Sequence, residues 1–114
     1  MTGAYDSEVD ARRAGGALVV APRGDLDLES APAVQATLDQ REPSDSRVVL
    51  DLRAVEFLDT SGLRLIVRCA EQARRDGFSF EVVRGSRHVQ RIFAIAGLDS
   101  GEIAFVDDLT DVDG

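Results

Sequence analysis

Apolar and polar residues occur in blocks along the chain, and these blocks predict an order of strands and helices. Residues 5–12 alternate weakly, Gly15 and Gly16 are typical of a turn, and residues 17–21 form a short apolar run. This pattern indicates a β-hairpin near the start of the chain. A run of β-branched and apolar residues at 47–52 then predicts a strand buried on both faces, which we expect to be the central strand of a sheet.

The clearest helical pattern runs from Ser61 to Asp76. At about 100° per residue, its apolar residues fall within one arc and its charged residues on the opposite side. The inward set is Leu63, Ile66, Val67, Ala70 and Ala73, and the outward set is Arg64, Arg68, Glu71, Gln72 and Arg75. Gly77 is the expected stop. The sequence therefore predicts a long amphipathic helix with one face in the core.

Two shorter helices are expected, one on either side of the long helix. Ser30 can cap the first of them, and Pro32 suits its first turn. Ser86 can cap the second, which Gly97 would end in a left-handed conformation. The expected inward residues are Val34 and Leu38 in the first, and Val89, Ile92, Phe93 and Ala96 in the second.

The order of these elements predicts the fold class. Two more strands are expected at 78–83 and 103–106, so strands alternate with helices after the opening hairpin. Such alternation requires right-handed crossovers and a mostly parallel sheet. We therefore predict an α/β fold, with a mostly parallel sheet of four to five strands, an antiparallel N-terminal edge and helices packed against it.

The size and charge of the chain limit the possible functions. Its 114 residues, 44% of them apolar, suit one domain over residues 1–114, with an ordered core from about 5 to 107 and an acidic tail at 107–114. The net charge is −8, but 9 of the 21 acids lie in residues 1–10 and 99–114, which contain no base. The middle of the chain is nearly neutral and has no basic stripe interleaved with aromatics, so we do not expect nucleic-acid binding.

Other features favour a cytoplasmic protein. No apolar run approaches the roughly 20 residues that span a bilayer, and the first ten residues do not resemble a secretion signal, so no membrane association is expected. The lone cysteine, Cys69, cannot form an internal disulfide, and we expect it to be a buried, inert thiol. His88 is expected to be an ordinary exposed side chain, and no metal-ligand set is present.

A candidate site lies at the start of the long helix, where residues 57–63 read Phe-Leu-Asp-Thr-Ser-Gly-Leu. A helix start places hydroxyl groups beside unpaired backbone N–H groups and the positive end of the helix dipole. A phosphate on Ser61 would be favourable there, with Arg64 three residues later as a possible counter-charge. The alternative is that Thr60 or Ser61 simply caps the helix.

The chain resembles the STAS domain and, within it, the bacterial anti-sigma factor antagonists. The resemblance covers nearly the whole chain and is carried by Gly24-Asp25-Leu26-Asp27 followed by Ala31, residues 48–52, residues 57–63, and Ile92-Phe93 leading to Gly97-Leu98. It implies a single STAS-like domain whose phosphoacceptor is Ser61, with Thr60 as a second, less favoured hydroxyl. It further implies that the unphosphorylated protein binds an anti-sigma factor with serine kinase activity and frees a sigma factor, and that phosphorylation ends this binding.

The resemblance also implies partners and a partner-facing surface. Asp27 and Asp59 match aspartates of the family that are associated with the surface facing the kinase. The expected contact residues are Asp25, Asp27, Asp59, Thr60, Ser61, Gly62, Arg64 and Arg68. A serine phosphatase would reverse the modification. No cofactor is implied for this chain, because ATP and magnesium would belong to the kinase, and a monomer or weak dimer is expected.

The sequence departs from the family at two points, and two other classes of function are considered. Arg64 stands where members often have a small glycine, and the usual final helix is shortened to a few residues around Leu109 and Val112. The alternative function is a STAS subunit of a lipid or solute transporter, or of a stress-signalling scaffold. An enzyme is not expected, because the sequence contains no G-x-S-x-G elbow or P-loop. Asp25 and Asp27 could form a carboxylate pair, although capping and loop solvation are the simpler roles.

Overall fold

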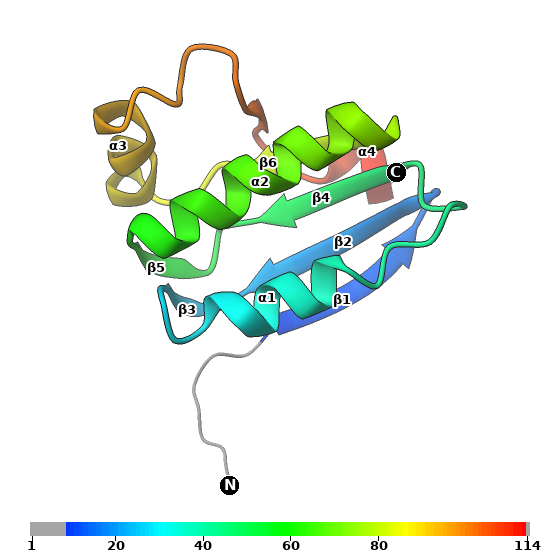
Figure 1. Cartoon of the computed structure of the whole chain (residues 1–114), viewed down its shortest axis with the longest axis horizontal. Coiled ribbons are helices and arrows are strands. Elements are labelled where there is room, and N and C mark those ends of the chain that lie inside the picture. Colours follow the sequence, from blue (N-terminus) through cyan, green and yellow to red (C-terminus); the bar gives the residue numbers. More distant parts are fainter. Residues whose placement is uncertain (1–8, 114) are drawn as a thin grey trace, which may run out of the picture.

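A five-stranded sheet in the order β1-β2-β4-β6-β7 forms the centre of the computed structural model, which describes residues 9–113 (Figure 1). Strands β1 and β2 are antiparallel, and the other neighbours are parallel. The strands are β1 (Val9–Ala14), β2 (Ala17–Pro22), β4 (Arg47–Asp51), β6 (Ser79–Val83) and β7 (Ala104–Val106). The predicted α/β class and antiparallel N-terminal edge are confirmed. The expected alternation at residues 5–8 lies outside the described residues.

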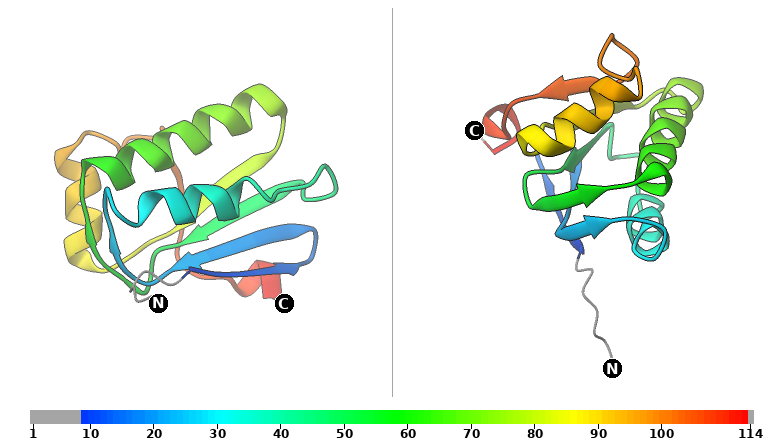
Figure 2. Two further views of the ribbon diagram at one scale, coloured as in Figure 1. Left: turned by 60° about the horizontal axis from the view of Figure 1, so that its bottom comes forward. Right: turned by 90° about the vertical axis from the view of Figure 1, so that its left-hand side faces the viewer.

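Helices cover the two faces of this sheet unequally. Helices α1 (Ala31–Leu38) and α2 (Thr60–Asp76) lie across one face, and α3 (Arg87–Ile95) lies beside the second, smaller sheet (Figures 1 and 2). The four-residue helix α4 (Thr110–Asp113) lies on the opposite face. Within residues 9–113, none of the helices combines the length and the apolar character that crossing a bilayer requires.

Strand β4 separates two apolar clusters, as the continuous apolar run predicts. Val48 and Leu50 face the main core under α1 and α2, whereas Val49 faces the other side of the sheet. The smaller cluster on that side consists of Ala17, Val19, Val49, Val83, Leu109 and Val112. Leu109 and Val112, next to and within α4, therefore complete the second face of the sheet.

Helix α2 has the predicted amphipathic pattern, and Ile66, Ala70 and Ala73 are buried as expected. Its buried arc is rotated from the predicted one, because Leu65 and Cys69 are buried whereas Leu63 and Val67 are only half-buried. Burial raises the pKa of the Cys69 thiol to about 11, which keeps it protonated at neutral pH. Gly77 ends the helix with a φ of 79°, a left-handed conformation that glycine adopts without strain.

The sequence does not predict a second sheet, in which β3 (Gly24–Leu26) pairs in parallel with β5 (Val55–Leu58). Both strands are short, with three and four residues, so their alternation is too brief to mark them as strands. Leu26 and Leu58 are buried between this sheet and the main core. The two-stranded sheet leads directly into α2.

Two details of the shorter helices differ from expectation. Ser30 stands at the N-cap position of α1, but its side chain does not cap the helix. Its hydroxyl instead donates to the Asp25 carbonyl at 2.7 Å and accepts from the Asp27 N–H at 3.0 Å. Ser86 caps α3 as predicted, accepting from the Val89 N–H at 3.1 Å. Ala96 is exposed rather than inward, because α3 ends before it.

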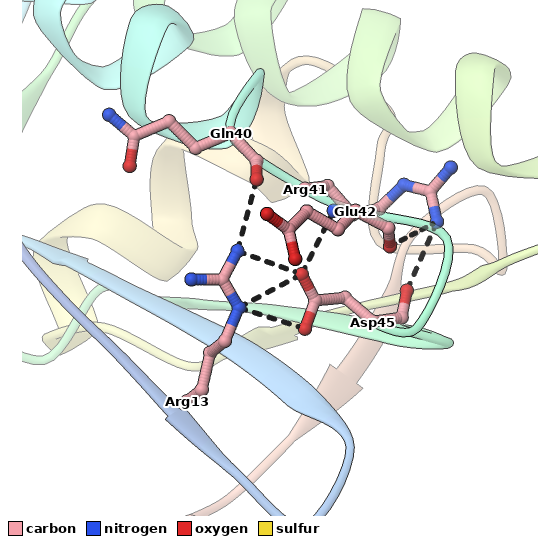
Figure 3. A network of polar contacts seen from close by, with 5 residues as sticks. All are labelled: Arg13, Gln40, Arg41, Glu42 and Asp45. Carbon is pink, nitrogen blue, oxygen red and sulfur yellow. Dashed lines mark hydrogen bonds and ion pairs between the residues drawn. The ribbon is translucent and has the colours of Figure 1, made fainter.

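A buried carboxylate ties the loop between α1 and β4 to strand β1 (Figure 3). Asp45 is only 3% exposed and accepts hydrogen bonds from Arg13 Nε at 3.0 Å and Nη2 at 2.9 Å. It also accepts from the Glu42 N–H at 2.9 Å. Arg13 donates in addition to the Gln40 carbonyl, and Arg41 donates to the carbonyls of Glu42 and Asp45. These bonds fix the loop on the hairpin.

We expect this network to make stability depend on pH. The Arg13 hydrogen bonds and the Glu42 N–H hold the pKa of Asp45 below its ordinary value of 3.8. Because the folded pKa is depressed, Asp45 contributes stability above the unfolded pKa and loses it as pH falls through the folded pKa. Asp45→Asn should therefore lower Tm at neutral pH, and its difference from wild type should shrink below about pH 4. Calorimetry across this range would measure the effect.

The matched control is Asp10→Asn, which removes the exposed carboxylate that pairs with Arg23 at the surface. Exposed ion pairs contribute little, so Tm should change much less at every pH. If the difference in Tm between Asp45→Asn and wild type stays the same as the pH is lowered, the role given to Asp45 is contradicted.

Candidate functional site

The candidate site lies where β5 ends and α2 begins, at the side of the molecule where the β3-β5 sheet meets the helix (Figure 2). Asp59 joins the two elements, and its backbone N–H donates to the Leu26 carbonyl of β3 at 3.2 Å. Thr60 is exposed, Ser61 is half-buried and Gly62 is buried. The predicted serine is therefore accessible at the first turn of a helix that is anchored in the core.

Asp59, and neither hydroxyl residue, caps α2. Its Oδ1 accepts hydrogen bonds from the backbone N–H groups of Ser61 at 2.8 Å and Gly62 at 3.1 Å. The interpretation of Thr60 or Ser61 as the cap is therefore wrong. Asp59 has the extended backbone typical of an N-cap, and its negative charge suits the positive end of the helix dipole.

This cap changes the electrostatics expected at Ser61. Two of the backbone N–H groups expected to be unpaired are already bonded to a carboxylate. An anion on Ser61 would lack these donors and would stand near the Asp59 charge. In residues 9–113, neither the Ser61 nor the Thr60 hydroxyl takes part in a hydrogen bond. The Ser61 hydroxyl is thus available for contact or chemistry, and the fold does not depend on it.

Gly62 is required by close packing beneath the helix start. A Cβ atom at this position would lie 2.5 Å from Leu58 Cδ1 and 2.6 Å from the Leu26 carbonyl oxygen. Real Cβ atoms do not approach backbone so closely, so any side chain would push α2 away from the small sheet. The glycine lets the first turn of α2 lie directly on β3 and β5.

The loop between β3 and α1 is held beside this helix start. Asp59 Oδ2 accepts from the Leu28 N–H at 3.3 Å, so one carboxylate bonds both segments. Asp27 Oδ1 accepts from the N–H groups of Glu29 at 3.1 Å and Ser30 at 3.0 Å, which makes it a turn-forming residue. The structure therefore places the Asp27 loop next to Asp59. The Asp25 side chain is exposed on β3, and its backbone carbonyl binds Ser30.

Arg64 and Arg68 lie on the outward face of α2, as predicted. Arg64 is one turn after Ser61, within reach of a charge placed there. Among the described residues, neither arginine forms an ion pair. Both guanidinium groups therefore remain available to a partner.

Two exposed apolar side chains near the site escaped the sequence reasoning. Leu28 is 75% exposed, and Phe57 is 44% exposed and stacks against His88 with ring centroids 6.3 Å apart. Phe57 is opposite Asp25 in the β3-β5 register. The outward orientation of Phe57 could not be predicted, because a four-residue strand is too short to show which of its apolar residues point outward. His88 is exposed, as expected.

No arrangement for metal chemistry is found in the part of the chain that the structure describes. Within it, no three His, Cys, Asp or Glu side chains converge as a bound ion would require. The geometry instead combines an accessible hydroxyl, exposed apolar groups and charges of both signs. This combination is typical of a surface that binds another protein.

Comparisons with known proteins identify the family and the fold. The sequence matches the STAS domain family over residues 8–111. It is 29% identical over 83 residues to BtrV of Bordetella bronchiseptica, a candidate anti-sigma factor antagonist, covering 72% of each chain. An anti-sigma factor antagonist from Mycobacterium paratuberculosis is 26% identical, with a TM-score of 0.78 over 94% of this chain and 91% of that one. Unphosphorylated SpoIIAA, at 14% identity, shares the fold with a TM-score of 0.72 over 92% and 93% of the two chains.

The cap assignment can be tested by truncating each candidate residue. Asp59→Ala removes both helix bonds and the link to Leu28, so it should lower the free energy of unfolding by about 1–2 kcal/mol. Thr60→Ala and Ser61→Ala should each change it by less than about 0.5 kcal/mol. Urea unfolding of the three variants would measure the difference. A Ser61→Ala protein as unstable as Asp59→Ala would restore Ser61 as the cap.

The steric role of Gly62 leads to a separate expectation. Gly62→Ala should destabilise the protein by about 1–3 kcal/mol, because overpacking outweighs the better helix propensity of alanine. Thr60→Ala, two residues earlier on an exposed position, is the matched control and should be nearly neutral. Thermal unfolding of both would decide the matter. A Gly62→Ala protein more stable than wild type would show that the close packing is not limiting.

Proposed function

This chain belongs to the STAS domain family, and we propose that it is an anti-sigma factor antagonist that binds an anti-sigma factor with serine kinase activity and so frees a sigma factor. Phosphorylation of Ser61 by that kinase would end the binding. The observation that carries this proposal is the Ser61 hydroxyl, which is half-buried, makes no hydrogen bond within residues 9–113 and stands at the start of a helix capped by a different residue.

The surroundings of Ser61 support a protein partner. Leu28 and Phe57 expose apolar surface on the two segments that flank Asp59. Apolar groups rimmed by polar residues are typical of interaction sites. Asp25 belongs to β3 and Asp27 to the loop after it, whereas Arg64 and Arg68 are exposed along α2. A partner would therefore need charges of both signs around an apolar contact.

The cap by Asp59 supports the phosphorylation switch. A phosphate adds nearly two negative charges at neutral pH. The nearest helix N–H groups already donate to Asp59, so they are not available to form hydrogen bonds with the phosphate. Burying an uncompensated dianion against a partner would cost several kcal/mol, so the complex would dissociate. The fold would persist, because α2 does not use the Ser61 side chain as its cap.

The presence of Arg64 suggests a partner that differs from the partners of family members with a glycine at this position. Its guanidinium adds bulk and positive charge one turn from Ser61, and it has no ion pair within residues 9–113. We propose that the partner presents an acidic residue at this point. Arg64 would also be the first side chain to meet a phosphate on Ser61.

The remaining parts of the proposed cycle lie outside this chain. ATP and magnesium would bind to the kinase, and a serine phosphatase would restore the hydroxyl. The antagonist itself would need no cofactor and would act in the cytoplasm as a monomer or weak dimer. Stress-response or sporulation-type signalling is the corresponding setting.

The test is an affinity capture from native lysate with three baits, read by mass spectrometry. Wild type should capture a small ATP-binding kinase of the anti-sigma type, and Ser61→Asp should not. Ser44→Asp, which adds the same charge on the exposed loop after α1, should capture it as wild type does. Ser61→Asp should also melt close to wild type, because its backbone N–H stays bonded to Asp59.

Three outcomes would contradict the proposal. Capture of the same transporter or scaffold subunits by wild type and Ser61→Asp would favour the alternative STAS functions. A Ser61→Asp protein that no longer folds would show that the site is structural. Equal loss of the kinase by Ser61→Asp and Ser44→Asp would mean that net charge, and not the position of Ser61, controls binding.

A further inference from the structure

A groove runs between α1 and the second half of α2, away from the start of α2 where Ser61 lies. Cys69 in its wall is eight residues after Ser61, roughly 12 Å along the helix axis. We propose that this groove binds a short-chain carboxylate, with its hydrocarbon end inside and its carboxylate near the arginines of α2. This site goes beyond the proposed function: it shares Arg68 with the proposed partner surface but does not use Ser61.

The inner part of the groove is a small hollow with an apolar floor. It has a volume of about 100 Å³ and is lined by the side chains of Leu38, Val48, Cys69, Phe78 and Phe80. Four of these residues belong to the main core, and Phe78 is packed against it. Polar residues, namely Asp39, Arg41 and Gln72, stand around the hollow. The hollow therefore fits an apolar group whose polar end points outward.

Arg41 is held firmly at the edge of this hollow. Its guanidinium lies 4.0 Å from the centre of the Phe78 ring. Nη1 donates to the carbonyls of Glu42 and Asp45 at 3.3 Å and 3.1 Å, within the network fixed by Arg13 (Figure 3). A side chain held by a ring and two carbonyls does not readily collapse into the space beside it. The hollow is thus maintained by the same network that ties the loop after α1 to β1.

The outer part of the groove carries the positive charge. It has a volume of about 280 Å³ and shares Cys69 and Gln72 with the inner hollow. Arg68 and Arg75 line it, two helical turns apart, and neither forms an ion pair among the described residues. Glu71 lies between them and lowers the local positive charge. A single carboxylate, rather than a polyanion, suits two arginines with one acid between them.

The size of the inner hollow selects the hydrocarbon. A volume of about 100 Å³ corresponds to about three water molecules, whereas a benzene-binding cavity measures on the order of 150 Å³. The end of a linear chain can enter this hollow while its remaining carbons lie along the outer groove, whereas a whole aromatic ring is too large for the hollow. Hexanoate therefore combines a suitable chain with the required charge.

The experiment is a titration of the full chain with hexanoate, followed by amide resonances in NMR spectra. We expect saturable shifts at Leu38, Gln72 and Phe80, with a dissociation constant in the millimolar range. Hexanol, which lacks the charge, should bind several-fold more weakly, and benzoate should not produce these shifts. The absence of saturable shifts at about 10 mM hexanoate would overturn the proposal.

Charge variants on α2 provide matched controls. Arg68→Gln and Arg75→Gln should each weaken binding by about two-fold to five-fold, as expected for exposed ion pairs. Arg74→Gln removes an exposed arginine from the same helix that does not line the groove, so binding should be unchanged. Glu71→Gln should strengthen binding. Equal weakening by all three arginine variants would show a general charge effect and would contradict the site.

The inner hollow can be filled to test the hydrocarbon contact. Cys69→Met places extra atoms in the hollow and should abolish the hexanoate shifts. If this variant does not fold, Gln72→Phe fills the same wall from a half-exposed position and should have the same effect. Persistent binding in a folded, filled variant would place hexanoate elsewhere. Because none of these variants changes Ser61, the outcome is separate from that of the kinase capture.

Discussion

The carboxylate of Asp59 accepts hydrogen bonds from three backbone N–H groups that belong to two segments of the chain. Oδ1 holds Ser61 and Gly62 at the start of α2, and Oδ2 holds Leu28 in the loop after β3. One side chain thus fixes the direction of the helix and the position of the loop beside it. Every residue of the candidate site depends on this arrangement, either because it lies on one of these segments or because it packs beneath them.

This arrangement also separates stability from signalling. Asp59 caps the helix, and Gly62, which has no side chain, lets the first turn pack directly against Leu26 and Leu58. Ser61 stands between these two structural residues and contributes no hydrogen bond from its hydroxyl within the described chain. A residue in this position can change its charge while its neighbours preserve the backbone. The site therefore has a rigid frame around one chemically free group.

Much of the fold was predictable because its signals are local or periodic. The buried strand β4 is a continuous apolar run, and in α2 the helical pattern of apolar and charged residues repeats over 17 residues. The β3-β5 sheet was not predictable, because its two strands contain three and four residues and pair across 31 or 32 positions of the chain. The position of the site was predictable from the residues around Ser61, but the contacts that hold the site together were not. Its cap and its exposed apolar residues follow from how Asp59 and Phe57 are oriented by that unpredicted sheet.

The short helix α4 has a practical consequence for handling the protein. Leu109 and Val112 are buried near the end of the described residues, and they pack with Val19 and Val49 on the second face of the sheet. The carbonyl of Val112 also lies close to the hairpin turn at Gly15. A deletion that begins before Leu109 would uncover a patch of β-branched side chains, so such a shortened protein would tend to self-associate.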